Sequence, residues 1–139
     1  MKSGMKWLCL ALLWATGAAS QVAVIAHKEA PLDTLSKTQL LDFYSCEIKF
    51  WNKELPVVVI DLKPQTEAKA AFYKFLGMTA SRMKSLWLKR MLMGEGEPPA
   101  ATKSEEEMLK KVAATPGALG FVSQNQNNKQ VKTLILILP

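Results

Sequence analysis

The chain has 139 residues, of which 49% are hydrophobic and 22% charged, with a formal net charge of +6. This length is enough for one compact domain with its own core and is short for two. The basic residues are interleaved with glutamates and form no dense Lys/Arg block, so we expect a solvated surface and no nucleic-acid partner.

Residues 1–20 have the organisation of a cleaved export signal. Two lysines precede a short apolar segment over residues 7–14, and three small residues end at Ser20. A membrane-spanning helix needs about 20 apolar residues, so this segment is too short to cross a bilayer. We therefore expect a signal peptide over 1–20, cleaved after Ser20, and a mature domain over 21–139. Loss of the two lysines lowers the formal charge from +6 to +4.

Two side chains with reactive chemistry stand alone in the mature sequence. Cys46 has no second cysteine to pair with inside the domain, so it is buried, paired between chains or reactive, and its place behind an apolar helix face favours burial. His27 follows a predicted strand, where a satisfied hydrogen bond is favoured over a metal-binding or general-base role. The sequence carries no zinc-protease, P-loop or nucleophile-elbow motif. We expect no catalytic residues, no metal and no cofactor.

The first half of the mature chain alternates between strand and helix patterns. Residues 22–26 predict a buried strand, and Ser36 with Gln39 forms a capping box for a helix that runs to about Ser45. The β-branched segment 56–60 predicts a strand covered on both faces. Strand, helix and strand in this order predict a right-handed βαβ unit.

Three more helices and two more strands follow. A helix over 65–76 has an apolar stripe and stops at Gly77, and a second spans about 80–92. The stripe consists of Ala68, Ala71, Phe72, Phe75 and Leu76. A second capping box, Ser104 to Glu107, starts the last helix. Strands are expected at 119–122 and 131–138 around a polar loop, and the apolar end 135–138 is expected to be covered. The alternation predicts an α/β fold, a single three-layer domain.

The best candidate for a binding site is the turn from Asp61 to Thr66, between a buried strand and the helix that follows it. A helix start presents unpaired amides and a partial positive charge, which suit an anion, and α/β sheets bind ligands beyond the carboxyl ends of their strands. The predicted ligand-binding residues are Lys63 for its charge, Gln65 for its amide and Thr66 for its hydroxyl. Ordinary capping of the helix is the alternative explanation of this turn.

Four segments of the chain, in order, resemble the phosphate-binding, PstS-like branch of the type 2 periplasmic solute-binding proteins. More closely, the chain is similar to the short single-domain phosphate ABC transporter substrate-binding proteins. Three parts of that family's pattern have similar segments in this chain. These are the first strand with the segment 35–40 (LSKTQL), the segment 48–51 (IKFW), and the strand-turn-helix from Val58 to Phe72. The segment 115–122 (TPGALGFV) nearly reproduces its T-P-G-A-I-G-Y-V and is the most specific match.

The resemblance implies a periplasmic-binding-protein-like type II α/β domain in the periplasm of a Gram-negative cell. It implies a non-enzymatic solute-binding protein with weak binding of phosphate or a related oxyanion, and a membrane transporter or periplasmic protein as partner. Two departures limit it. Full-length members enclose the anion between two lobes, whereas this sequence is expected to form little more than one. Their phosphate turn carries Ser-Gly-Thr where this chain has Pro64-Gln65-Thr66. The alternative is a protein-interaction module that reuses the fold without a small-molecule ligand, and a homo-oligomer would also complete the cleft.

Overall fold

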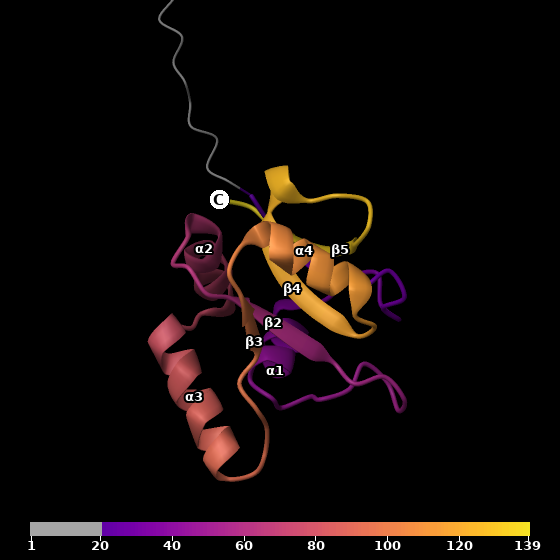
Figure 1. Cartoon of the computed structure of the whole chain (residues 1–139). Helices are drawn as coiled ribbons and strands as arrows, with labels where there is room; N and C mark the ends of the chain where they lie inside the picture. Colours follow the sequence, from indigo (N-terminus) through magenta and orange to yellow (C-terminus); the bar gives the residue numbers. More distant parts are fainter. Residues whose placement is uncertain (1–20) are drawn as a thin grey trace, which may run out of the picture.

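The computed structural model describes residues 21–139, so the predicted signal peptide over 1–20 lies outside the described residues. The elements in chain order are β1 (Val22–Ala26), α1 (Lys37–Tyr44), β2 (Val58–Leu62), α2 (Glu67–Leu76), α3 (Ala80–Leu92), β3 (Ala100–Thr102), α4 (Glu105–Ala114), β4 (Ala118–Ser123) and β5 (Lys132–Ile137). The five strands form one sheet in the order β3-β2-β4-β1-β5 (Figure 1).

The sheet is mixed, which corrects one expectation. Strand β2 is parallel to both β3 and β4, whereas β1 is antiparallel to both β4 and β5. In the strand order, β4 separates β1 from β2, and the pairings show that β1 and β2 run in opposite directions. The predicted βαβ unit is therefore wrong. All five residues of β1 are buried, and such a continuous apolar run fits an inner strand of either direction.

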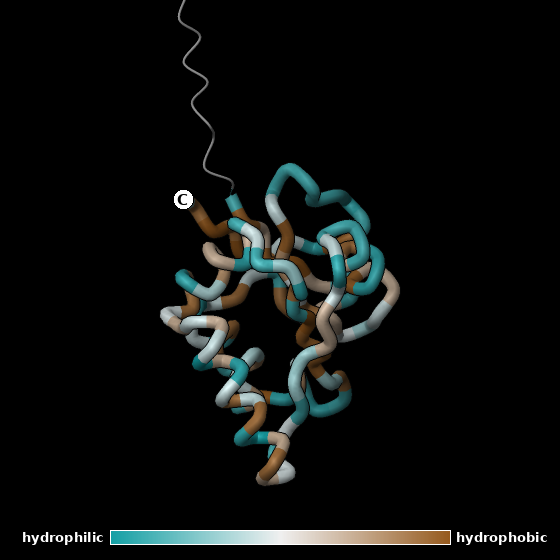
Figure 2. Tube along the Cα trace, turned by 60° about the vertical axis from the view of Figure 1, so that its left-hand side comes forward, coloured by the Kyte–Doolittle hydropathy of each residue, from teal (hydrophilic) through white to brown (hydrophobic). Residues whose placement is uncertain are grey.

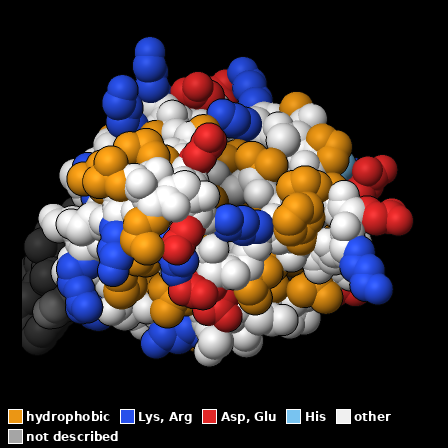
Figure 3. Space-filling view, turned by 90° about the horizontal axis from the view of Figure 1, so that it is seen from below, with side chains coloured by type: hydrophobic (Ala, Val, Ile, Leu, Met, Phe, Trp, Pro, Cys, Tyr) orange, Lys and Arg blue, Asp and Glu red, His pale blue; other side chains and the backbone are white. Residues whose placement is uncertain are grey.

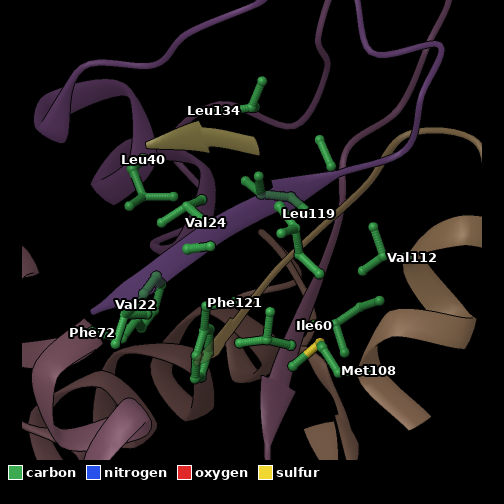
Figure 4. Close-up of a cluster of buried hydrophobic side chains, with 14 of the residues drawn as sticks. Val22, Val24, Leu40, Ile60, Phe72, Met108, Val112, Leu119, Phe121 and Leu134 are labelled. Carbon is green, nitrogen blue, oxygen red and sulfur yellow. The ribbon is translucent and has the colours of Figure 1, made fainter. Parts of the chain in front are cut away.

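The helices cover both faces of this sheet, as expected for a three-layer α/β domain. On one face, Phe121 of β4 stacks on Phe72 of α2 with ring centroids 4.0 Å apart. On the other face, Gly120 lies against α4, where an added Cβ would come within 2.6 Å of the Met108 sulfur. Figure 4 shows Phe72 beside Phe121 and Met108 near Ile60 on the side of α4. Successive residues of one strand thus pack into two different layers.

Local capping signals account for most helix ends. Ser36 Oγ accepts the Gln39 amide at 3.1 Å, and Gln39 Oε1 accepts the Ser36 amide at 2.9 Å, so the first capping box is confirmed. The second is half formed: Ser104 Oγ accepts the Glu107 amide at 3.1 Å, but the Glu107 carboxylate accepts the Lys103 amide instead. Helix α2 ends at Gly77 with φ 71°, as its position predicted.

Several burial expectations need correction. Helix α2 buries Lys69 and Tyr73 beside its apolar residues, while Ala71 and Phe75 are only half-buried. The apolar end 135–138 is covered only in part: Ile137 is buried, but Leu136 is 44% and Leu138, just after β5, 66% exposed. Strand β3 was not predicted from the sequence: it is short, and its three residues are held by parallel pairing with β2.

The two isolated reactive side chains have ordinary surroundings. His27 Nδ1 accepts the Glu29 amide at 3.1 Å, a satisfied hydrogen bond of the kind expected. Cys46 is half-buried rather than buried, and burial raises the pKa of its thiol, which disfavours the reactive thiolate. Within residues 21–139, His, Cys, Asp and Glu side chains form no group of three that could hold a metal ion.

Helix α3 extends away from the sheet toward the lower end of the molecule (Figure 1). Its inner side is anchored by the buried Met83 and Trp87, and Trp87 Nε1 donates to the Tyr44 carbonyl at 2.7 Å. The hydropathy colouring shows hydrophobic positions at this lower end as well as in the core (Figure 2). Among the described residues, none of the helices has both the length and the apolar character needed to cross a bilayer.

Candidate functional site

The candidate site lies at the edge of the sheet where three parallel strands end. The register pairs Leu62 with Thr102, and the Lys63 amide donates to the Thr102 carbonyl at 2.8 Å, which aligns the ends of β2 and β3. β4 is parallel to β2 and ends at Ser123 on the same edge. The helices that follow β2 and β3 therefore both start here. Their starts and the end of β4 enclose an open hollow of about 540 Å³, lined by Thr66, Glu67, Ala68, Ser104, Glu105, Glu106, Ser123, Asn125 and Gln126.

The start of α2 offers amide donors to this hollow. Thr66 is the N-cap, and its Oγ1 accepts the Lys69 amide at 3.2 Å. The amides of Glu67 and Ala68 precede the first residue that can bond within the helix, so they have no intrahelical acceptor. Together with the partial positive charge of the helix start, they favour an electronegative group in the hollow.

The start of α4 repeats this arrangement, but one of its acids occupies nearby donors. Ser104 is the N-cap and satisfies the Glu107 amide. Glu105 Oε1 accepts hydrogen bonds from both the backbone amide and the hydroxyl of Ser123, at 2.9 and 2.8 Å. A carboxylate of the protein itself thus holds the two donors at the end of β4.

Carboxylates dominate the charge around the hollow. Glu67, Glu105 and Glu106 all line it, and of these Glu106 is paired with the exposed Lys110 at 3.2 Å. Acids in a first helical turn stabilise the helix, but they also repel an incoming anion. The hollow therefore contains amide and hydroxyl groups that attract an anion, together with carboxylates that repel it. The carboxylates limit how tightly an anion is held.

Behind the hollow, a buried polar cluster joins α2 to β2. Lys69 Nζ donates to the Leu62 carbonyl at 2.6 Å and lies 3.6 Å from Asp61 Oδ2, while the Tyr73 hydroxyl donates to Asp61 Oδ1 at 2.9 Å. All three side chains are buried. Burial, and then the neighbouring Asp61 charge, raise the pKa of the Tyr73 phenol well above its usual value. The cluster fixes the first turns of α2 against the end of β2, and so the position of the candidate site.

The three predicted ligand-binding residues have different positions in the structure. Thr66 lines the hollow and is brought together with Ser104 and Ser123. Lys63 and Gln65 are exposed in the turn before it, and they are not among the lining residues. Thr66 also caps α2, so the capping alternative describes one role of its hydroxyl.

Residues distant in sequence complete the hollow, and these were missed from the sequence. Ser104 and Glu105 were interpreted only as helix-capping residues, and Asn125 and Gln126 only as a polar loop. A usable signal did exist, because a capping box after a short strand marks a second helix start. Only the parallel pairing of β3 with β2 brings that start beside Thr66.

The segment 115–122, the most specific part of the resemblance, has a structural explanation. Gly117 has φ 82°, and an added Cβ would lie 2.2 Å from the Pro56 carbonyl oxygen. The Gly117 carbonyl also accepts a hydrogen bond from Trp51 Nε1 at 2.9 Å. Gly120 allows α4 to approach β4 closely. Both glycines are required by close packing, and neither lines the hollow.

Comparisons with known proteins give matches in structure and none in sequence. No family model matches the chain, and no curated protein matches it. Among solved structures, it is similar to a putative phosphate ABC transporter substrate-binding protein with bound phosphate from Clostridium perfringens, with a TM-score of 0.67 and 19% identity over 84% of this chain and 46% of that one.

Two further solved structures agree. An ABC-type phosphate transport receptor from Vibrio cholerae matches with a TM-score of 0.65 and 18% identity, over 84% of this chain and 47% of that one. PstS from Borrelia burgdorferi matches with a TM-score of 0.59 and 15% identity, over 83% and 47%. The chain spans about half the length of these structural neighbours. Over the part of those structures that it matches, the chain has the mixed α/β fold of the PstS-like phosphate transporter substrate-binding proteins.

Proposed function

We propose that residues 21–139 form a periplasmic, non-enzymatic solute-binding-like domain that holds phosphate or a related oxyanion weakly. The site is the hollow between the starts of α2 and α4. The observation that carries this proposal is the convergence of two capped helix starts and three hydroxyls, those of Thr66, Ser104 and Ser123, at one edge of the sheet. The similar structures of a putative phosphate ABC transporter substrate-binding protein with bound phosphate and of an ABC-type phosphate transport receptor support it.

The charges in the hollow favour one class of oxyanion over another. Glu67 and Glu105 repel any anion, but a carboxylate oxygen accepts a hydrogen bond from a protonated oxyanion. Phosphate carries such a proton near neutral pH, whereas sulfate does not. We expect phosphate to bind with millimolar affinity, because the hollow is open to water, and sulfate to bind more weakly.

Lys63 and Gln65 have a supporting role in this proposal. Both are exposed in the turn that leads into Thr66. Both residues precede Thr66 closely in the chain, so we expect Lys63 to add a positive charge near the hollow and the Gln65 amide to contact a bound anion. We expect Lys63→Gln to weaken phosphate binding about threefold in low salt, and less in high salt, because an exposed charge acts through a screened field.

Isothermal titration of the purified protein with phosphate and with sulfate in low salt tests the ligand. Glu105→Gln keeps acceptors for Ser123 and removes one negative charge, so we expect it to strengthen sulfate binding. Glu54→Gln, an exposed acid of a distant loop, is the matched control and should change nothing. Absence of both heat and thermal shift at millimolar phosphate would rule out the ligand.

The second candidate is a periplasmic interaction module that binds a transporter subunit or another protein through the same fold. One observation favours it: Glu105 occupies the donors of Ser123, so the protein itself fills part of the hollow. Cross-linking in intact cells followed by recovery of one specific partner would support this candidate. Sedimentation would separately detect a homo-oligomer that completes the hollow.

A further inference from the structure

The outer side of α3 exposes large apolar side chains that nothing in the domain covers. Leu88 is 52%, Met91 46% and Leu92 76% exposed, and Met93, directly after the helix, is 57% exposed. They are half of the eight large hydrophobic residues exposed among residues 21–139. Figure 3, which views the molecule from below, shows hydrophobic side chains on this face with Lys, Arg, Asp and Glu side chains among them. We call Leu88, Met91, Leu92 and Met93 the α3 apolar patch.

The same helix carries only positive charges. Its sequence contains no Asp or Glu between Ala80 and Leu92. Arg82, Lys84 and Lys89 are exposed, whereas the fourth cation, Arg90, is bound to Glu47 and Glu95. The acids near α3 therefore neutralise its inward cation and leave the three outward ones unopposed on the helix itself.

Cations and apolar side chains share one strip of the helix surface. Lys84, Leu88 and Leu92 follow each other at intervals of four residues, so they lie along one ridge. Lys89 lies beside this ridge. A helix with apolar side chains flanked by lysine and arginine is suited to lie on a bilayer, with the apolar groups at the level of the headgroups and the cations against anionic lipids.

The charge pattern selects among possible occupants of this surface. A second copy packed on the same face by two-fold symmetry would bring Lys84 and Lys89 of both copies together, and like charges would oppose that contact. An anionic surface has the complementary charge. We propose that α3 docks the domain on the surface of an anionic phospholipid bilayer through the α3 apolar patch, Arg82, Lys84 and Lys89.

This orientation is compatible with the candidate site. In Figure 1 the lower end of α3 and the start of α4 lie toward opposite ends of the molecule. Docking through α3 therefore leaves the hollow between α2 and α4 open to the solvent. The docking proposal does not depend on what the hollow binds.

The proposal is tested by co-sedimentation of the protein with lipid vesicles. The protein is purified from cells that express the full chain. We expect binding to vesicles of phosphatidylcholine with one quarter phosphatidylglycerol, and little binding to phosphatidylcholine alone. Leu88→Ser with Leu92→Ser should weaken binding at least about tenfold. Lys84→Gln with Lys89→Gln should weaken it about 30-fold and reduce its salt dependence. Because all variants are expressed from the same full chain and differ only at the substituted positions, differences between them report on α3.

Matched controls remove equivalent groups elsewhere. Leu136→Ser changes an exposed leucine of β5, and Lys28→Gln with Lys129→Gln removes two exposed lysines far from α3 in sequence. These variants should bind as the unchanged protein does, and thermal unfolding should show that all variants fold. Equal binding to neutral vesicles, or equal binding by the α3 and control variants, would overturn the proposal. So would a dimer in sedimentation that only the Leu88 and Leu92 substitutions dissociate, because the patch would then belong to a second copy.

Discussion

Two cations of this molecule hold helices in place through pairs of oxygen atoms, but in opposite surroundings. Lys69, only 2% exposed, joins α2 to β2 through Asp61 and the Leu62 carbonyl. Arg90 joins the end of α3 to Glu47 and Glu95, whose side chains are 58% and 44% exposed. The comparison shows that the contact between α2 and the end of β2 depends on buried polar groups. If one partner is removed, water cannot reach the other to solvate it. At the end of α3, water and salt compete with every ion pair.

The largest expected effect comes from breaking the buried pair. Lys69→Met leaves the Asp61 carboxylate buried with only the Tyr73 hydroxyl as partner, and should lower the free energy of unfolding by about 3–5 kcal/mol. Chemical denaturation measures this. Lys74→Met, an exposed lysine of the same helix, is the control and should cost little. If Asp61→Asn combined with Lys69→Met is no more stable than Lys69→Met alone, an unpaired buried charge is not the cause.

Two glycines extend the comparison to the packed turn before β4 and the more open junction between α2 and α3. Gly117→Ala must accept φ 82° and a Cβ 2.2 Å from the Pro56 carbonyl oxygen, so we expect a loss of about 2–5 kcal/mol. Gly77→Ala has φ 71° but no atom within 4 Å of the new Cβ, so only the backbone cost of about 1–2 kcal/mol remains. Thermal unfolding of both variants distinguishes steric overlap from backbone strain. Equal losses would mean that the contact with Pro56 relaxes freely.

The two tyrosines report on burial at the sheet in a pH-dependent way. Burial raises the pKa of both Tyr44 and Tyr73 above the usual value of ~10. The unfolded chain therefore loses these protons first as the pH rises. The stability they contribute is complete below pH ~10, and above it should fall by about 1.4 kcal/mol per pH unit for each phenol. Denaturation at increasing pH measures this decline, and tyrosinate absorbance appearing in the folded protein near pH 10 would contradict it.

The smallest effect is expected at the exposed cation. Glu47→Gln removes one partner of Arg90 but leaves Glu95 at 3.0 Å, so the free energy of unfolding should change little, because water screens an exposed ion pair. The change should disappear in high salt. Denaturation at two salt concentrations tests this, and a loss approaching that of Lys69→Met would show that exposure does not separate the two cations.

Features that depend on neighbouring residues were predictable from the sequence. The capping box at Ser36 and Gln39 set the start of α1, and Gly77 set the end of α2. The turn before α2 was identified as a helix start, and Thr66 does line the hollow. In each case the hydrogen bonds join residues three or four apart in the chain, so the sequence contains both partners side by side.

Features that depend on distant residues were not predictable. Nothing near Lys69 in the sequence indicates a buried cation, because its partner Asp61 belongs to a strand and meets it only after α2 packs on the sheet. The exposed Leu136 and Leu138 were expected to be covered, since their apolar pattern equals that of a buried strand. The apolar pattern shows which residues are suited to burial. It does not show whether another element of the fold packs over them.

The sequence by itself determined the helices, four of the five strands and one helix start suited to an anion, because capping, turns and hydrophobic periodicity are local. Only the tertiary structure decided that β1 is antiparallel to β4, that β3 pairs with β2, and that Ser104 and Ser123 face Thr66. The physical reason is that a buried apolar strand satisfies its hydrogen bonds equally well in either direction. Which strands lie next to it depends on how the helices cover both faces of the sheet at the same time. The whole chain contributes to that packing.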